Sequence, residues 1–401
     1  MSKLEASLLG ASGSAPDSEM SLQKSLSFDL PEEITDAYRE LATFSQDSSI
    51  QTNKRSETAS TSSLLNKLAL LRIMTTSLYE EAITELLVDM PSAHDSLVAI
   101  ATHDNGLNVE LAEVESSFYS YSLSDARLLS RHTDSNIIES FYAVEGSNAQ
   151  RFPYASALTP GYVALLQDSA HAALIIDLGE VARWHYIPSS VNQGKEQQQA
   201  YTHNVVPCGK LLNLMTRHAT KGETPFDTGG KLSVQGKRST ELLDLWLSRC
   251  ADYQQKNNLS STFFPLQEQF YNDALLNSRL KISSLDALCT SAHWIAERIC
   301  QDITQCLGAI DDSCEVILMG GCKNNGLLLS LLSSLLPVSS FHKLSDHGLI
   351  EDSIDSVAVA VLGVFACLAL PLPTQSSCDS VGRLTLGSTQ SYQRLMQFLR
   401  N

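Results

Sequence analysis

A glycine pair late in the chain has the composition and spacing of an anion-binding turn. Gly320 and Gly321 follow the apolar run 316–319, and Asn325 precedes leucines at helical spacing. This order predicts a buried strand, a tight turn and the start of a helix. Glycines let a ligand approach the backbone, and unpaired N–H groups at a helix start attract anions. We therefore expect Gly320, Gly321 and Asn325 to bind a nucleotide, although such junctions also occur in α/β domains that bind nothing.

A second candidate phosphate site lies near the start of the chain. A short apolar strand within residues 6–18 leads into a Ser/Gly loop, in which Ser12, Gly13 and Ser14 precede Asp17. Small residues ahead of a carboxylate suit a turn that holds phosphate, with Asp17 binding Mg²⁺. The alternative is a frayed polar coil, the ordinary structure of a Ser/Gly/Pro stretch close to a terminus.

A histidine follows another predicted strand. The apolar run 96–101 ends just before His103. Carboxyl ends of strands are where α/β proteins place ligand-binding side chains, so His103 is a candidate substrate contact. A purely structural histidine is the alternative.

Helical and extended patterns alternate around these residues. Helices are predicted over 64–90 and 285–307, a hairpin over 174–187, and a flexible polar loop over 45–63. At 401 residues the chain is long enough for two sizeable cores. The sequence therefore predicts an α/β protein of two lobes around a cleft.

The composition limits the kinds of partner that the protein could bind and the cell compartment in which it could work. The net charge of -17, without any basic stripe, argues against a nucleic-acid partner. No apolar run reaches the roughly 20 residues of a bilayer span, so we expect no membrane partner. Nine cysteines without a CxxC pair indicate neither a zinc site nor a disulfide framework. Scattered thiols and an N-terminus without a signal-peptide core lead us to expect a cytoplasmic protein.

The succession of these junctions resembles the anhydro-N-acetylmuramic acid kinase family over nearly the whole chain. The family's SGTSxDG loop corresponds loosely to residues 12–18, and its SHGQT segment to 102–106. Its later motifs NIGGIAN, DTGPGN, YDxxGxxAxxG and GGGxxN correspond to 177–183, 204–209, 226–236 and 320–325. The resemblance implies a two-lobed actin-like, hexokinase-like ATPase fold with an interlobe cleft.

The resemblance also implies which ligands the protein binds and where its two lobes begin and end. ATP and Mg²⁺ would be the cofactors, an amino sugar the substrate, and a homodimer the assembly. Asp177 and Gly179 would join His103 in binding the sugar. The first lobe would span 1–130 plus about 380–401, and the second lobe 131–379 with the glycine turn on the nucleotide side.

The residues expected to perform the reaction depart from the family pattern. Family members open the 1,6-anhydro ring and phosphorylate O6, which needs a carboxylate to activate water. The family's catalytic Asp falls on Ser140, and a serine is no base near neutral pH without another base beside it. Glu139 and Glu145 are the nearest substitutes, although on a strand Glu139 would point to the opposite face from Ser140.

Three functions stay open at this point. The first is an active ATP-dependent kinase of anhydro-N-acetylmuramic acid that works in cell-wall recycling. The second is a non-catalytic relative that binds nucleotide, sugar or a partner. The third is an interaction protein with a vestigial cleft.

Overall fold

The computed structural model describes most of the chain. The described residues are 3–12, 19–46, 58–88, 90, 95–103, 107–111, 117–139, 158–166, 171–189, 201–256, 270–275, 282–308, 310, 313–336, 340–347, 349, 353–370 and 382–400.

The chain forms two compact units. Unit 1 comprises Met1–Pro153, Ala157–Leu165 and Asp352–Asn401, and unit 2 comprises Tyr154–Ser156 and Leu166–Glu351. Residues 131–153, 157–165 and 352–379 belong to unit 1, whereas the sequence placed them in the second lobe. Strand pairing explains part of the difference, because β6 (Ile137–Glu139) lies between β3 (Ile100–Ala101) and β12 (Arg383–Thr385) in one sheet.

Unit 2 is built on a five-stranded mixed sheet with the order β11-β10-β7-β8-β9. Its strands are β7 (Ala173–Leu178), β8 (Val181–Ile187), β9 (Tyr201–Pro207), β10 (Glu315–Met319) and β11 (Phe341–His342). β10 is parallel to β7 and β11, while β7, β8 and β9 form an antiparallel meander. The apolar runs 173–176 in β7 and 316–319 in β10 are buried, as expected for strands covered on both faces of a sheet.

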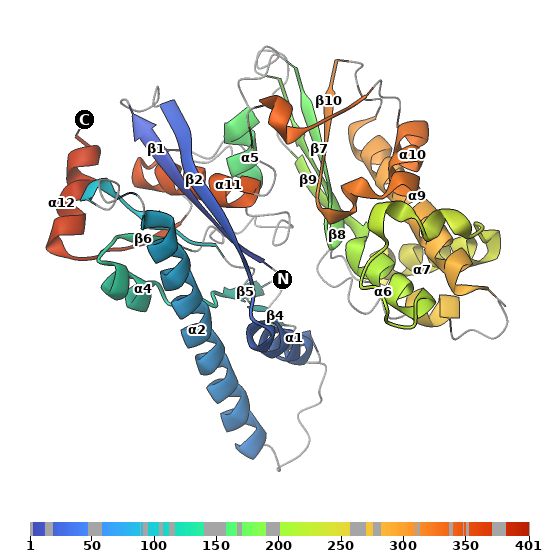
Figure 1. Ribbon diagram of the computed structural model, residues 1–401, viewed down its shortest axis with the longest axis horizontal. Coiled ribbons are helices and arrows are strands. Elements are labelled where there is room, and N and C mark those ends of the chain that lie inside the picture. The colour runs from blue at the N-terminus through green and yellow to red at the C-terminus, as the bar shows by residue number, and fades with distance from the viewer. Residues whose placement is uncertain are drawn as a thin grey trace. The chain divides into compact units, whose positions relative to one another are not determined.

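Helices and one sheet face share the core of unit 2. The helices are α6 (Gly209–Ala219), α7 (Thr240–Lys256), α9 (Ser284–Leu307) and α10 (Gly326–Leu335), and they lie together at one side of the sheet (Figure 1). The core includes Trp246, Phe270 and Trp294, whose rings lie 4.7–5.7 Å apart in tilted or edge-on pairs. Such aromatic pairs add directional packing to the burial of their area.

Unit 1 combines the three-stranded sheet β12-β6-β3 with two hairpins, β1 (Lys3–Ser12) with β2 (Glu19–Asp29) and β4 (Leu107–Leu111) with β5 (Ser117–Tyr121). Its helices are α1 (Glu32–Gln46), α2 (Thr58–Leu87), α4 (Ala126–Thr133), α5 (Thr159–Leu166), α11 (Ile354–Cys367) and α12 (Thr389–Phe398). α11 contacts β1, where the Ser7 and Ser356 hydroxyl oxygens are 2.7 Å apart. α5 crosses α11 closely, because a Cβ on Gly161 would come within 2.6 Å of the Ala358 carbonyl oxygen.

The predicted α/β class is confirmed, and two local predictions need correction. Residues 45–46 and 58–63 of the predicted loop are helical, at the end of α1 and the start of α2. A helix extends cheaply once its nucleus has formed, so the leucine-rich segment after 63 can carry Ser and Thr in its first turns. The strand β2 was not predicted, although Leu22, Leu26 and Phe28 lie at even spacing in it.

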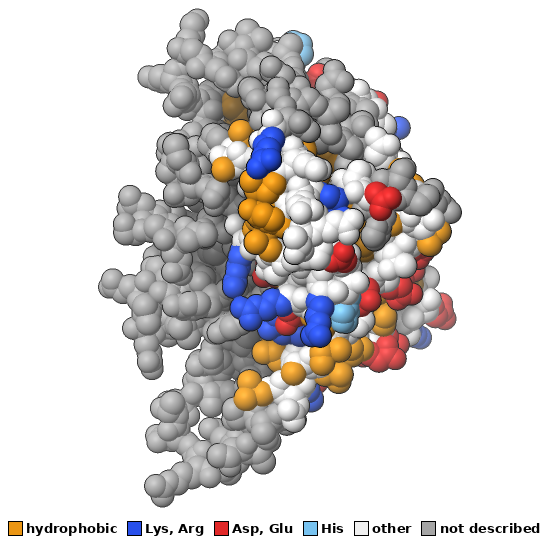
Figure 2. Space-filling view, turned by 90° about the vertical axis from the view of Figure 1, so that its left-hand side faces the viewer, with side chains coloured by type: hydrophobic (Ala, Val, Ile, Leu, Met, Phe, Trp, Pro, Cys, Tyr) orange, Lys and Arg blue, Asp and Glu red, His pale blue; other side chains and the backbone are white. Residues whose placement is uncertain are grey.

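Surface charge is mixed in the described part of the molecule. The face shown in Figure 2 carries Lys and Arg side chains with Asp and Glu beside them, and exposed hydrophobic side chains between. Among the helices that the structure describes, none is long and apolar enough to cross a membrane.

Candidate functional site

Two parallel strands of unit 2 end side by side and bring their glycine turns together. Met319 at the end of β10 pairs with Asp177 near the end of β7. Gly320 has a φ of 88°, and a Cβ there would lie 2.6 Å from Asp177 Oδ1 and 2.6 Å from the Gly179 nitrogen. Only glycine fits this contact. We call Asp177, Gly179, Gly320, Gly321 and Asn325 the strand-end cluster.

The cluster is open at Gly321 and closed at Gly320. A Cβ on Gly321 would meet no atom within 4 Å, whereas the space beside Gly320 is filled by the neighbouring turn. Gly321 begins the 3-10 helix η4 (Gly321–Asn324), which leads into α10. Of the two glycines, Gly321 therefore offers the backbone surface that a ligand could approach.

Asn325 caps the helix that follows. Its Oδ1 accepts a hydrogen bond from the Leu328 N–H at 3.1 Å, and its side chain is buried. Gly230, with a φ of 74°, leaves room for it, because a Cβ on Gly230 would lie 2.5 Å from the same oxygen. The Asn325 side chain thus positions α10, which is the ordinary work of an N-cap asparagine.

Asp177 is paired with a cation. Its Oδ2 lies 3.1 Å from Nε of Arg183, the residue opposite it on β8. The Asp177 side chain is 14 % exposed, so this pairing satisfies a largely buried carboxylate. The predicted sugar contact therefore carries a neutralised charge.

The strand-to-helix junction from β9 to α6 faces the same β7–β8 turn. The Gly209 N–H donates to the Gly179 carbonyl at 2.9 Å, and the Cys208 N–H donates to the Glu180 carbonyl at 2.9 Å. Nζ of Lys210 lies 2.8 Å from Oε2 of Glu180. Burial raises the pKa of Glu180 and the attraction of Lys210 opposes it, leaving the pKa below its ordinary value. N–H groups at this helix start are thus already bound to protein carbonyls.

Two thiols meet between the junctions. Cys208 is fully buried, and its thiol is hydrogen-bonded to that of Cys322, which is half-buried on η4. That hydrogen bond, followed by burial, raises the pKa of Cys208, and the same bond lowers the pKa of Cys322. Cys322 is therefore the more acidic and more reactive thiol of the pair.

The other described candidates lie in unit 1, at the carboxyl ends of two parallel strands. β3 pairs with β6, and the Thr102 N–H donates to the Ile138 carbonyl at 2.8 Å. His103 therefore follows one strand where Glu139 ends its neighbour, and the Tyr79 hydroxyl donates to the His103 carbonyl at 2.9 Å. Glu139 is half-buried and lies opposite Arg383 on β12. This adjacency of His103 and Glu139 at one sheet edge follows from the pairing.

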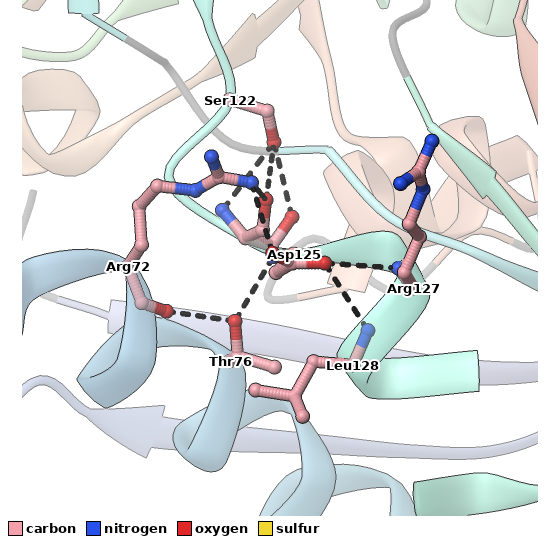
Figure 3. Close-up of polar contacts among 7 residues, drawn as sticks. Arg72, Thr76, Ser122, Asp125, Arg127 and Leu128 are labelled. Carbon is pink, nitrogen blue, oxygen red and sulfur yellow. Dashed lines mark hydrogen bonds and ion pairs between the residues drawn. The ribbon is translucent and has the colours of Figure 1, made fainter. Parts of the chain in front are cut away.

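A polar network holds the helix that precedes β6 (Figure 3). Asp125 Oδ1 accepts from the N–H groups of Arg127 and Leu128 at 3.0 and 3.1 Å and so caps α4. The Asp125 N–H donates to Thr76 Oγ1 at 2.9 Å, and Arg72 on the same helix α2 lies 3.4 Å from Asp125 Oδ2. The network ties α4 to α2 and sets where β6 starts.

Of the remaining predicted site residues, one lies in a strand of a hairpin and the others lie outside the described residues. Ser12 ends β1 opposite Glu19 of β2. Gly13, Ser14, Asp17, Ser140 and Glu145 lie outside the described residues.

Sequence reasoning missed the Cys208–Cys322 contact, the Lys210–Glu180 ion pair and the packing of Gly230 on Asn325. All three join segments that are at least 30 residues apart in the sequence. The one available signal was the glycine pair 229–230 after Asp227, which marks a special backbone conformation.

Comparison with known proteins identifies the family. The family model described as anhydro-N-acetylmuramic acid kinase matches residues 42–392. Among curated proteins, the chain is 24 % identical to the anhydro-N-acetylmuramic acid kinase of Acaryochloris marina over 67 % of this chain and 70 % of that protein. It is 25 % identical to that of a Cyanothece species over 57 % of this chain and 60 % of the relative.

Among solved structures, the component A of the Acidaminococcus fermentans (R)-2-hydroxyglutaryl-CoA dehydratase aligns with a TM-score of 0.30 and 11 % identity, over 51 % of this chain and 65 % of that one. The family match covers well over half of the sequence and includes the strand-end cluster, both strand-to-helix junctions and β6. This chain therefore belongs to the anhydro-N-acetylmuramic acid kinase family.

Proposed function

We propose that the chain carries out the reaction for which its relatives are named, the ATP-dependent phosphorylation of anhydro-N-acetylmuramic acid. The observation that carries this proposal is the family match over 42–392, which contains the open Gly321 backbone beside the β7 and β10 strand ends. Peptidoglycan recycling in the cytoplasm is the corresponding role. The chain aligns with 60–70 % of the length of the two relatives described above, so substrate and activity are inferences from kinship.

The strand-end cluster partly fits a nucleotide. Gly321 leaves its backbone uncovered at the start of η4, and Lys323 adds a cation to the same short helix. ATP would supply the phosphoryl group, and these residues would hold its phosphates, as backbone N–H groups and lysines do elsewhere. Asn325 would support the site through the α10 cap.

The fit to Mg²⁺ rests on the N-terminal loop. The carboxylates of Asp177 and Glu180 are paired with Arg183 and Lys210 in the structure. In the described part of the chain, the only group of three potential metal ligands lies elsewhere, at His203, Asp302 and Cys306. Asp17, with Ser12, Gly13 and Ser14, is therefore the proposed holder of magnesium and phosphate.

On the sugar side we assign roles to His103, Asp177 and Gly179 as contacts and to a glutamate as the base. Glu139 or Glu145 would take the proton of the water that attacks the anomeric carbon, in place of Ser140. Glu139 ends β6 beside the strand that leads to His103, which supports it as the first residue to test.

The test is transfer of the γ-phosphoryl group from Mg-ATP to anhydro-N-acetylmuramic acid, followed by the mass of the product. The expected product is the 6-phosphate of N-acetylmuramic acid, and Glu139→Gln should lower kcat by roughly 100-fold or more if Glu139 is the base. Glu145→Gln is the matched variant and should then retain activity. Folded protein that forms no product at high concentration would overturn the kinase proposal.

A second candidate function is that of a non-catalytic relative, and the junction at Cys208 favours it. The N–H groups of Cys208 and Gly209 are bound to the carbonyls of residues 179 and 180, where the family has a glycine-rich phosphate loop. Calorimetry separates the alternatives: binding of a non-hydrolysable ATP analogue or of the anhydro-sugar, without product formation, would support a binding protein. Binding of neither would favour an interaction protein with a vestigial site. Light scattering of the same sample would show whether it is the expected homodimer.

A further inference from the structure

An imidazole, a carboxylate and a thiol lie together on unit 2, outside the strand-end cluster. His203 is on β9, and Asp302 and Cys306 are one turn apart on α9. One potential ligand atom from each residue lies within 4.8 Å of the other two. His203 and Cys306 are exposed and Asp302 is buried, so the group has one fixed donor and two that can turn toward an ion.

The fixed donor is held by two hydrogen bonds to one oxygen. Trp184 Nε1 donates to Asp302 Oδ2 at 2.8 Å, and His203 Nδ1 lies 2.6 Å from the same atom. Trp184 and His203 are opposite each other on β8 and β9. In the described part of the chain no hydrogen bond reaches Asp302 Oδ1 or His203 Nε2. The hydrogen bond holds His203 Nδ1 and Asp302 Oδ2 side by side, so an ion between them would replace it and bind both atoms, with the ring proton on Nε2.

Cys306 adds a soft donor where a thiol is otherwise unusual. Cysteine is among the residues most often buried, and Cys306 is the exposed one among the cysteines whose side chains the structure describes. It lies in the last turn of α9, which carries no basic side chain. The negative end of a helix dipole favours a cation at this place.

We propose that His203, Asp302 and Cys306 bind a divalent metal ion of the zinc class. Nitrogen, oxygen and thiolate ligands together suit Zn²⁺, with bond lengths of about 2.0–2.3 Å and water in the fourth position. Binding exchanges the Cys306 S–H proton for the metal and releases that proton to the buffer. The ion would clamp the edge strand β9 onto α9, four residues before β9 ends at Pro207 and the chain turns to Cys208. The reading without metal is a structural Asp302–His203 hydrogen bond, which the test excludes or supports.

Calorimetric titration of zinc into untagged, chelator-stripped full-length protein tests the proposal. We expect one bound ion per chain, together with a proton release that shows in the buffer dependence of the heat. Cys306→Ser and His203→Gln should each weaken binding by roughly tenfold or more. Cys367→Ser and His342→Gln, which change a thiol and an imidazole outside the group, are the matched controls and should bind as the unchanged protein does.

Cobalt and thermal unfolding provide independent readouts. Co²⁺ should give a thiolate-to-metal charge-transfer band that is absent in Cys306→Ser, and zinc at 100 times its Kd should raise the Tm by a few degrees. Asp302→Asn is not the decisive variant, because the loss of the bonds to Trp184 and His203 also destabilises the fold. Two results would overturn the site. One is zinc binding that neither Cys306→Ser nor His203→Gln weakens. The other is an unchanged protein that binds zinc no more tightly than the protein with both substitutions. Neither result depends on kinase activity.

Discussion

Unit 2 has two strand-to-helix junctions that contact the same β7–β8 turn. They differ in which groups accept hydrogen bonds from the first N–H groups of the helix. From β10 to α10, Gly320 packs on the turn, Gly321 stays uncovered, and the Asn325 side chain caps the helix. From β9 to α6 no side chain caps the helix, and carbonyls of the turn accept its first N–H groups instead. A helix start that is capped by a side chain can leave nearby backbone open to a ligand, whereas one that is capped by a neighbouring turn cannot. We therefore assign the proposed nucleotide site to the junction from β10 to α10, the first junction below, rather than to the junction from β9 to α6, the second junction.

The largest effect is expected from Gly320→Ala. The new methyl would lie 2.6 Å from Asp177 Oδ1 and from the Gly179 nitrogen, at a φ of 88° that disfavours alanine. We expect a loss of about 3 kcal/mol or more in the free energy of unfolding, measured by urea denaturation.

Gly321→Ala is its matched control. Because no atom lies within 4 Å of the added Cβ, the free energy of unfolding should change by less than about 0.5 kcal/mol. The affinity for Mg-ATP should nevertheless fall, since the methyl occupies the uncovered side. Unchanged affinity in a stable Gly321→Ala protein would remove the first junction from the nucleotide site.

The free energy of unfolding should depend on pH through His185, which lies on β8 and contacts β9, the strand that leads to the second junction. Burial, and then the positive charge of Arg183, lower the pKa of His185 to about 3, and His185 Nδ1 lies 2.9 Å from Thr202 Oγ1 of β9. Since the unfolded chain takes up this proton near the ordinary pKa of about 6.5 and the native protein does not, stability falls as the pH drops from about 6.5 toward 3.

By pH 5 this linkage should have cost about 2 kcal/mol. His185→Gln should lose that part of the slope in urea titrations between pH 7 and pH 5, and His342→Gln on β11 should keep it. Equal slopes in both variants would show that His185 is protonated in the native state.

Removing the side-chain cap at the first junction should destabilise the protein less than Gly320→Ala does. Asn325→Ala removes the bond to the Leu328 N–H and should lower the free energy of unfolding by about 1–2 kcal/mol and weaken Mg-ATP binding as well. Asp125→Ala removes a comparable cap, at α4 in unit 1, and should cost a similar amount without changing nucleotide affinity. An unchanged affinity in Asn325→Ala would separate the cap from the site.

The smallest effect on stability is expected from Glu180→Gln. The ion pair with Lys210 is partly exposed, so its loss should change the free energy of unfolding by no more than about 0.5 kcal/mol. If the second junction binds no phosphate because of its internal contacts, removing this partner of Lys210 should increase ATP affinity a few-fold. A decrease would mean that the second junction already takes part in binding.

Local patterns were sufficient for much of this architecture. The apolar run before Gly320 and the leucines after Asn325 predicted β10 and α10, and the spacing of Leu288, Ala292, Ile295 and Ile299 predicted α9. The sequence assigned Asp177 and Gly179 to the sugar and Gly320 to the nucleotide, whereas the structure brings all three together, because the parallel strands β7 and β10 end at one edge of the sheet.

Contacts that depend on the order of strands could not be read from local pattern. Nothing in the spacing of Cys208 and Cys322 says that β9 and β10 are both neighbours of the β7–β8 pair. His203 and Asp302 are separated by some hundred residues and meet only because α9 packs on the sheet. Strand β2 was not predicted for a different reason: the polar residues in it make its alternating apolar pattern weak.

The order in which the chain is synthesised bears on how unit 1 is completed. Unit 1 is closed by β12, which pairs with β6, and by α11, which packs on β1, and both are made after every strand of the unit 2 sheet. On the ribosome, the five-stranded sheet can therefore finish folding while the earlier part of unit 1 still lacks its partners. A nascent chain that stops before residue 383 would expose the unpaired edge of β6, the kind of edge that invites association with other chains.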